Sequence, residues 1–270
     1  GIVITIVMTL LAVAFLFPIF LVLMNSFKNK LYISDAPFAL PNSDTFSGMY
    51  NYVNGIQKTG LLVAAGRSAF ITICSVIVIV LLTSMAAWWI TRVTCKLSTV
   101  LYYLFVFAMI VPFQMVMFTL SKVTDFLHLG NMFGIIPVYL GFGAGLSLFM
   151  FCGFIKAIPI SLEEAAMIDG CTPVQTYFKV IVPMLRPTMI TVAILNAMWI
   201  WNDYLLPTLV LDSEKPTIPM AVQYLRGGYG SIDMGAMMAM LVLAILPIIV
   251  FYLTCQKYII KGVAAGAVKG

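Results

Sequence analysis

Long apolar runs, separated by short polar segments, dominate the chain. Within a run such as Val76–Leu82 the hydrophobic positions are continuous and do not alternate with polar ones. A helix needs about 20 mainly apolar residues to cross a bilayer, whereas a barrel strand alternates over about 10 residues. Windows that are almost free of charged residues therefore predict six membrane-spanning helices, at about residues 2–24, 68–90, 97–121, 132–155, 188–210 and 235–256.

Composition supports a membrane environment. Hydrophobic residues make up 62% of the chain and charged residues only 9%, whereas soluble domains average roughly 45–50% and about 25%. This balance excludes a soluble globular enzyme and a disordered chain. The net charge of +5 is thinly spread, so we expect no nucleic-acid partner. The sequence predicts an all-α integral membrane protein, with residues 1–270 as a single transmembrane domain.

The flanks of the predicted spans indicate an orientation. Lys and Arg are slightly more frequent on the side that would hold both termini, and cytoplasmic loops carry the excess of positive residues. We therefore expect both termini in the cytoplasm. Gly1 leads directly into an apolar run without the basic start or cleavage site of a signal peptide. We expect a short polar segment to precede it.

The segment between the fourth and fifth predicted spans opens with a helix signal. Ser161 and Glu164 have the spacing of a capping box, in which the two residues satisfy each other's backbone N–H groups. The acidic pair Glu163 and Glu164 suits the positive end of the helix macrodipole. Helical spacing places four residues on one face: Leu162, Ala165, Ala166 and Asp169.

A turn and a second short helix are predicted next. Gly170 can adopt the positive φ that ends a helix. Thr172 and Gln175 form a second capping box, and Pro183 and Pro187 are expected to end or bend the helix. The result would be a rigid helix-turn-helix outside the membrane, suited to being held by a soluble partner. The alternative is an ordinary connecting loop, stabilised by its own caps.

The same segment resembles the signature of the permeases of binding-protein-dependent ABC importers, EAA, three residues, G, nine residues, I-x-L-P. The matching residues are Glu164-Ala165-Ala166, Gly170 and Val180–Pro183, with Val180 and Val182 replacing Ile and Leu. Further similarity is to the carbohydrate-importing branch, and above all to the shorter permease subunit of maltose and oligosaccharide importers. It rests on Asp169, Phe178, Pro187, the run Trp201-Asn202-Asp203-Tyr204 and the tail at 256–270.

The resemblance implies a type I ABC permease fold, with a core region at 66–257 and a cytoplasmic coupling loop at 156–187. It implies that the loop docks on an ATPase through Glu163, Glu164, Ala165, Ala166, Asp169 and Gly170. The tail residues Lys261, Gly262, Gly266 and Lys269 would pack on the same ATPase. The alternative for this tail is a basic segment beside anionic lipid.

The resemblance also implies the partners and the location. The partners would be a second, homologous permease subunit in a heterodimer, two cytoplasmic ATPase subunits, an extracytoplasmic sugar-binding protein and membrane lipid. The chain would lie in the inner membrane of a bacterial or archaeal cell and would bind no cofactor itself. The sequence has no G-x-x-x-x-G-K-[ST] loop, so ATP and Mg²⁺ would bind the partner ATPase and the chain would not be an enzyme.

Polar residues within the spans are candidates for a substrate pathway, because such residues are costly in lipid and often functional. Asp203 is the one charged residue within a predicted span. The candidates are Gln114, Asn196, Trp199, Asn202, Asp203 and Tyr204. The structural alternative, which we favour, is that the aromatic residues form an interfacial belt and the polar ones tie helices together.

Three other functions compete with sugar import. A permease for glycerol phosphate, a polyol or another solute delivered by a binding protein would carry the same signature. A secondary carrier would usually show several intramembrane charges, and an intramembrane enzyme would need paired catalytic groups; one Asp and no His lie within the predicted spans. The five cysteines form no CxxC pair and predict apolar packing, with no metal site.

Overall fold

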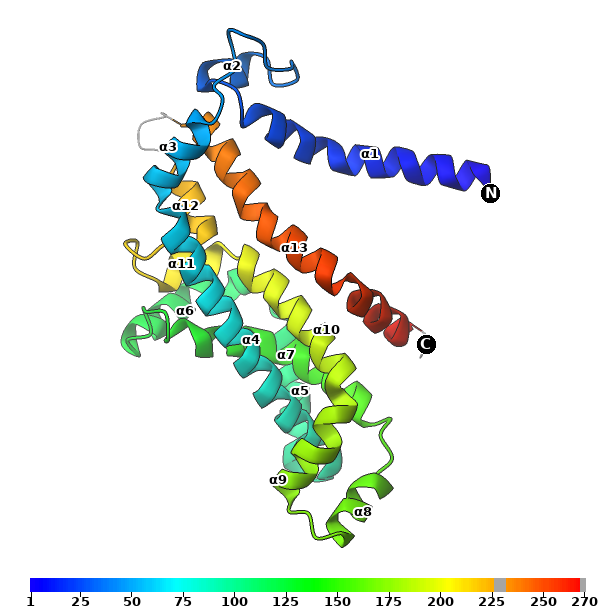
Figure 1. The fold of residues 1–270 in the computed structure, drawn as a ribbon. Helices are drawn as coiled ribbons and strands as arrows, with labels where there is room; N and C mark the ends of the chain where they lie inside the picture. The colour runs from blue at the N-terminus through cyan, green and yellow to red at the C-terminus, as the bar shows by residue number, and fades with distance from the viewer. Residues whose placement is uncertain (226–231, 268–270) are drawn as a thin grey trace. The chain divides into compact units, whose positions relative to one another are not determined.

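Helices make up most of the described chain (Figure 1), which confirms the predicted fold class. The computed structural model describes residues 1–225 and 232–267, with side chains of the last stretch described through residue 258. The α-helices are α1 (Ile2–Asn25), α2 (Lys30–Asp35), α3 (Tyr50–Thr59), α4 (Leu61–Arg92), α5 (Lys96–Ile110), α6 (Phe113–Phe126), α7 (Ile135–Ile155), α8 (Ser161–Ile168), α9 (Pro173–Thr176), α10 (Val182–Asn202), α11 (Leu205–Val210), α12 (Ile218–Tyr224) and α13 (Met234–Ala267). A π-helical segment, η1 (Tyr177–Ile181), joins α9 to α10.

Five helices in the described part of the chain are long and apolar enough to cross a membrane. They are α1, α4, α7, the continuous helix Pro173–Asn202 and α13 up to Tyr258. The pair α5 and α6 would make a sixth span, but the two helices are bent by 106° relative to each other. The expected third span at 97–121 is therefore not one straight helix. Pro112 lies at the break, where it lacks the N–H that would continue the helix.

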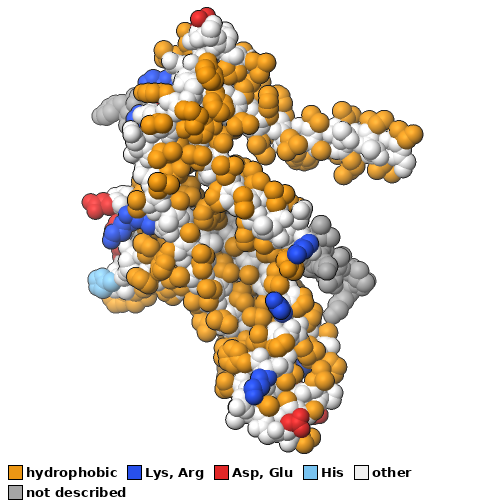
Figure 2. Space-filling view, in the orientation of Figure 1, with side chains coloured by type: hydrophobic (Ala, Val, Ile, Leu, Met, Phe, Trp, Pro, Cys, Tyr) orange, Lys and Arg blue, Asp and Glu red, His pale blue; other side chains and the backbone are white. Residues whose placement is uncertain are grey.

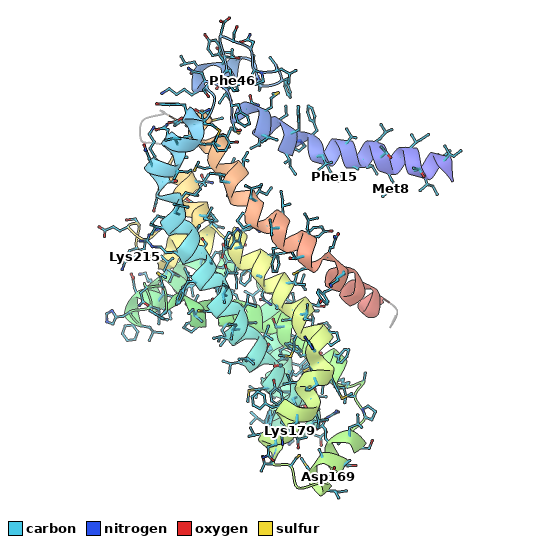
Figure 3. All side chains as sticks on the ribbon, in the orientation of Figure 1. Met8, Phe15, Phe46, Asp169, Lys179 and Lys215 are labelled. Carbon is cyan, nitrogen blue, oxygen red and sulfur yellow. The ribbon has the colours of Figure 1, made fainter. Side chains whose placement is uncertain are left out.

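The fold divides into two compact units. The first contains residues 1–67 and 214–251. In this unit, α1 has no buried residue in its most apolar window, and hydrophobic side chains cover its visible face (Figure 2). Met8 and Phe15 project from it into open space (Figure 3). Such a helix is stable only when lipid or another protein surrounds it.

A polar cluster holds the chain together after α1. Asn51 on α3 donates from its side-chain amide to the carbonyl oxygens of Ser26 and Lys28, at 2.8 and 2.7 Å. The hydroxyls of Ser26 and Tyr52 are hydrogen-bonded at 2.7 Å. The buried Lys28 ammonium donates to the carbonyl oxygen of Ala36 at 2.9 Å. These bonds satisfy the backbone groups of the α1–α2 connection and tie it to α3.

A second polar contact in the first unit links α3 to the start of α13. Asp233, just before α13, accepts from Lys58 at 2.7 Å, from Asn54 at 3.0 Å and from the backbone N–H of Ala236 at 3.2 Å. Burial disfavours the charged carboxylate, but the three donors outweigh burial and hold the pKa of Asp233 below its usual value. The carboxylate is therefore more stable as an anion in the folded chain than in the unfolded one.

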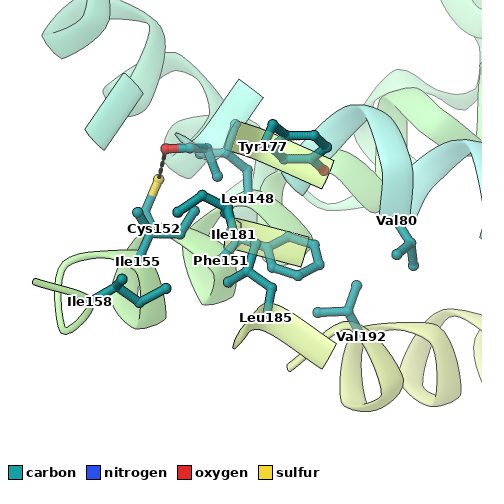
Figure 4. Packing of buried hydrophobic residues seen from close by; sticks show 11 residues of the cluster. Val80, Leu148, Phe151, Cys152, Ile155, Ile158, Tyr177, Ile181, Leu185 and Val192 are labelled. Carbon is teal, nitrogen blue, oxygen red and sulfur yellow. Dashed lines mark hydrogen bonds between the residues drawn. The ribbon is translucent and has the colours of Figure 1, made fainter. Parts of the chain in front are cut away.

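The second unit contains residues 68–213 and 252–270. Its core lies between α4, α7, η1 and α10. One hydrophobic cluster, drawn in Figure 4, is made of Val80, Ala87, Leu148, Phe151, Cys152, Ile155, Ile158, Tyr177, Ile181, Leu185 and Val192. A second cluster comprises Ile71, Ile79, Ile135, Val138, Tyr139, Ile200, Leu206, Val210 and Leu211.

Two glycines let neighbouring helices approach α7 closely. A Cβ added to Gly145 would lie 2.8 Å from the Phe105 carbonyl oxygen on α5, and one added to Gly143 would lie 2.7 Å from Asn196 Oδ1 on α10. A Cβ on Gly141 would meet nothing within 4 Å. Small residues at membrane helix contacts serve this purpose. Gly143 and Gly145 therefore lie on a helix-packing face of α7.

A methyl group at Gly145 should loosen the α5–α7 contact. Because the obstructing atom is backbone, Gly145→Ala should destabilise the protein by about 1–3 kcal/mol, the usual cost of overpacking. Gly141→Ala, on the same helix, should be neutral or slightly stabilising. Thermal unfolding in detergent measures both variants, and equal midpoints would contradict the assigned packing.

The contact at Asp233 predicts a pH-dependent stability. A carboxylate with a lowered folded pKa stabilises the protein above its unfolded pKa of about 3.9, and this stabilisation is lost as the pH falls through the folded pKa. Asp233→Asn should therefore lower the free energy of unfolding at neutral pH by up to about 1 kcal/mol, since Lys58 is half exposed.

The difference from the parent protein should close below about pH 4. The exposed Asp44→Asn variant serves as the control for loss of one negative charge. A difference between Asp233→Asn and the parent that stays constant from pH 7 to pH 3 would show that the ionised carboxylate does not contribute.

Candidate functional site

The predicted helix-turn-helix loop is present, but its first helix begins differently from the expectation. The N-cap of α8 is Ile160, and Ser161 is already the first helical residue, with no side-chain cap. The predicted Ser161–Glu164 capping box is therefore wrong. The backbone of Ile160 takes the place of a cap, since its carbonyl oxygen accepts from the N–H groups of Glu163 and Glu164 at 2.9 and 3.1 Å.

The turn after α8 confirms the predicted role of Gly170. This residue has φ of +84°, which is in the left-handed region. The N–H of Cys171 bonds to the Ala166 carbonyl oxygen at 2.9 Å, and the N–H of Gly170 bonds to the Met167 carbonyl oxygen at 3.0 Å. These two bonds form a Schellman motif, which satisfies the last carbonyl groups of the helix and fixes the turn.

The second capping box is confirmed, but the second helix does not end where expected. Thr172 Oγ1 accepts from the N–H of Gln175, and Gln175 Oε1 accepts from the N–H of Thr172. The helix then continues through η1, Pro183 and Pro187 to Asn202. Pro183 lies inside this continuous helix, just after η1, and its missing N–H interrupts the backbone hydrogen bonds there. The π-helical segment shifts the hydrogen-bond register just before it.

The two faces of α8 differ from the predicted grouping. Glu163 and Ala166 are buried, whereas Leu162, Glu164, Ala165 and Asp169 are exposed, as is Gly170. Ala166 is thus separated from Leu162, Ala165 and Asp169, with which it was expected to share a face. The exposed side also carries Met167 and Ile168, the latter 86% exposed. Asp169 is at the tip of the loop (Figure 3).

The buried carboxylate of Glu163 is bound within the chain. Its Oε1 accepts from Nε of Arg92 at 2.7 Å, and its Oε2 accepts from Nε1 of Trp88 at 2.9 Å. Nη2 of Arg92 also lies 2.7 Å from Glu163 Oε1 and donates to the carbonyl oxygen of Ile158 at 2.9 Å. Glu163 therefore ties α8 to the end of α4, and its side chain does not face outward as expected for a docking residue.

A second contact joins the loop to α4. The hydroxyls of Tyr177 and Ser84 are hydrogen-bonded at 2.7 Å, and the ring of Tyr177 packs against that of Trp88 with centroids 5.5 Å apart. Ser84, Trp88 and Arg92 are four residues apart and so share one face of α4. None of the three was among the residues predicted from the sequence, although an Arg at the end of an apolar run, with Trp and Ser at this spacing, indicates such a face.

The sequence placed Asp203 inside the fifth membrane-spanning helix, but in the structure this residue lies just beyond the helix. It follows the last residue of α10. Its Oδ1 accepts from the N–H groups of Leu205 and Leu206 at the start of α11, and its Oδ2 accepts from the Tyr139 hydroxyl at 3.2 Å. Trp199 packs edge-on against Tyr139, with centroids 5.5 Å apart. The structure thus brings Asp203 and Trp199 together around Tyr139 on α7.

The other pathway candidates are dispersed. The buried Asn196 donates to Ser147 Oγ at 3.0 Å and ties α10 to α7. Asn202 donates back to the Met198 carbonyl oxygen on its own helix. Gln114 is exposed on α6, and Tyr204 is exposed between α10 and α11. The tail residues predicted to pack on the ATPase, Lys261, Gly262, Gly266 and Lys269, lie beyond residue 258, the last one whose surroundings the structure describes.

Comparisons with known proteins identify the family. Residues 75–265 match the family described as "Binding-protein-dependent transport system inner membrane component". The "Probable starch degradation products transport system permease protein AmyC" of Thermoanaerobacterium thermosulfurigenes is 38% identical over 96% of this chain and 93% of its own. The "Multiple sugar-binding transport system permease protein MsmG" of Streptococcus mutans is 37% identical over 98% and 95%.

A solved structure has the same fold. It belongs to a bacterial ABC transporter involved in the import of the acidic polysaccharide alginate, with a TM-score of 0.79, 23% identity, and coverage of 96% of this chain and 95% of that one. The family match and the two relatives above confirm the family that the loop signature indicated. The chain belongs to the binding-protein-dependent transport system inner membrane components: it is a multi-pass permease subunit of an ABC importer, which works with a binding protein and leaves ATP hydrolysis to separate ATPase subunits.

Proposed function

We propose that the chain imports a sugar, most simply an oligosaccharide, as one of two homologous permease subunits that enclose the pathway. The proposal is supported by the names of relatives that match nearly the whole chain. Besides the two permeases above, the "Melibiose/raffinose/stachyose import permease protein MelC" of Bacillus subtilis is 29% identical over 99% of this chain. The exposed apolar helices, α1 above all, leave surface for lipid and a second subunit.

The loop at 161–183 would couple this pathway to the ATPase. The supporting observation is its exposed tip, held on a rigid turn. Leu162, Met167 and Ile168 present apolar side chains beside the acidic Glu164 and Asp169. A protein surface that is both exposed and apolar is typical of an interaction site. With the loop in the cytoplasm and the α5–α6 pair counted as one crossing, both termini would lie there as well, in agreement with the distribution of Lys and Arg.

The sugar pathway would be lined by the exposed members of the candidate set. Trp199 and Tyr204 are partly accessible, and their ring faces suit the C–H surface of a sugar. Gln114 lies just after the break between α5 and α6. Asp203 and Asn196, by contrast, have their polar atoms engaged in contacts with other helices. We assign these two residues to holding α7, α10 and α11 together.

Gly170 provides the test of the coupling role. Proline fixes φ near −65° and cannot adopt the observed +84°, so Gly170→Pro should displace the turn. We expect ATP-driven uptake of a labelled maltodextrin to fall about tenfold or more, because a left-handed turn costs about 1–2 kcal/mol for ordinary residues and is inaccessible to proline. Co-purification of the ATPase subunits should weaken in parallel.

Gly170→Asn is the matched control, because asparagine tolerates left-handed backbone and nothing would obstruct its Cβ. It should retain most of the uptake. Full uptake and full ATPase association in Gly170→Pro would refute the coupling role of the loop. Uptake of a polyol or glycerol phosphate with no uptake of any oligosaccharide would refute the sugar assignment alone.

Asp203→Asn separates a structural role from a pathway role. The variant keeps one acceptor for the N–H of Leu205 but presents an NH2 donor to the Tyr139 hydroxyl oxygen, so a charged hydrogen bond is replaced by a weaker neutral one and the midpoint of thermal unfolding should fall by the equivalent of about 1 kcal/mol. The KM for uptake should not change. Tyr139→Phe removes the bond entirely and should lower the midpoint at least as much. A raised KM at an unchanged midpoint would place Asp203 in the sugar pathway.

A further inference from the structure

One face of α4 carries three side chains that all reach the coupling loop. Ser84 is bonded to Tyr177, Trp88 packs on Tyr177 and donates to Glu163, and Arg92 pairs with Glu163. We call the contact among Trp88, Arg92 and Glu163 the α4–α8 clasp. Residues four apart on a helix lie one above the other, so the contacts form a continuous line along α4 toward its last turn.

The charged groups of the clasp are buried, and they are hydrogen-bonded to other groups of the same chain. Only 6% of the Glu163 side chain and 16% of the Arg92 side chain are exposed. Both carboxylate oxygens of Glu163 accept hydrogen bonds, and Arg92 also holds the Ile158 carbonyl oxygen before α8. Glu164, the next residue, is exposed. The two adjacent glutamates therefore face different ways, and Glu164 alone is accessible to a partner.

The position of the clasp matters because of how the loop is connected. The loop leads into α10 through the continuous helix that starts at Pro173. Movement of the loop therefore acts on α10 directly through the chain. The turn at Gly170 separates α8 from that helix, and the covalent chain alone would let α8 pivot without moving α4. The charged hydrogen bonds of the clasp remove this freedom, since such bonds are stronger and more directional than neutral ones.

We propose that Trp88, Arg92 and Glu163 are positioning residues that pass the movement of the ATPase-held loop to α4, so that α4 and α10 move as one body. This inference rests on the proposed coupling role of the loop. Exposed residues of α8 meet the ATPase, and the clasp carries the displacement into the membrane. Packed elements joined by specific polar contacts are the usual carriers of rigid-body rearrangements.

The test uses the complete importer in proteoliposomes, with its partner permease, ATPase subunits and binding protein. Three quantities are measured: co-purification of the ATPase, ATP hydrolysis stimulated by the binding protein, and sugar molecules imported per ATP hydrolysed. Glu163→Gln and Arg92→Gln should retain the ATPase and lower the import per ATP about tenfold, within the range of about 5- to 150-fold that couplings between sites show.

A rescue variant and matched controls distinguish loss of the movement passed from the loop to α4 from a general loss of folding. The double variant Arg92→Glu with Glu163→Arg restores the ion pair and should recover part of the import per ATP. Recovery should be incomplete, because the Trp88 N–H then lacks its acceptor at position 163. Trp88→Phe keeps an aromatic ring beside Tyr177 but removes the N–H and the second ring of the indole. It leaves the ion pair intact, should give a smaller loss, and serves as the test if the charge variants fail to fold. Arg67→Gln, the same change near the opposite end of α4, should leave all three quantities unchanged.

Each remaining outcome decides against the inference. Import per ATP within twofold of the parent in all clasp variants would overturn it. Loss of ATPase association in Glu163→Gln, as expected for Gly170→Pro, would show that the clasp only shapes the docking surface, and the proposed coupling role would stand. If Gly170→Pro alone were harmless, the coupling role itself would fail, whatever the clasp variants did.

Discussion

A chain with so few charges, placed in a membrane, must pair each charge or keep it in water, because an unpaired ion is costly in a low-dielectric environment. This constraint organises the polar contacts of both units. Glu163 meets Arg92 where α4 ends, Asp233 meets Lys58 where α13 begins, and Asp203 occupies the break between α10 and α11 with Tyr139 as a donor. In each case a single carboxylate serves two purposes, since it satisfies backbone or side-chain donors and also fixes two helices relative to each other.

The loop at 161–183 shows the same constraint. Its rigidity comes from backbone geometry at Gly170 and from the Thr172 cap, neither of which needs a partner. Its attachment comes from Glu163, which turns inward, and so the outward face of α8 is left to Leu162 and Ile168. The exposed face of α8 thus carries apolar side chains beside the acidic Glu164 and Asp169, while its buried face holds the charge of Glu163.

The membrane core obeys a different rule. Between helices in lipid, close packing replaces the hydrophobic effect as the source of specificity. Gly143 and Gly145 let α7 approach α10 and α5, and Asn196 bonds to Ser147 beside this contact. The break at Pro112 then turns the chain from α5 into α6.

The sequence by itself determined the helical membrane class, the family and the glycine turn, because these depend on local properties: length of apolar runs, backbone freedom at Gly170 and the spacing of a short signature. Tertiary structure decided where α8 begins and which way its side chains face, because these depend on residues distant in the sequence. Ser161 was expected to cap α8, but the helix starts one residue earlier on the Ile160 carbonyl oxygen. Glu163 looked equivalent to Glu164 until Arg92 and Trp88, more than seventy positions away, turned it inward. Which face of a short amphipathic helix is buried depends on the partner that covers it, and that partner is distant in the sequence.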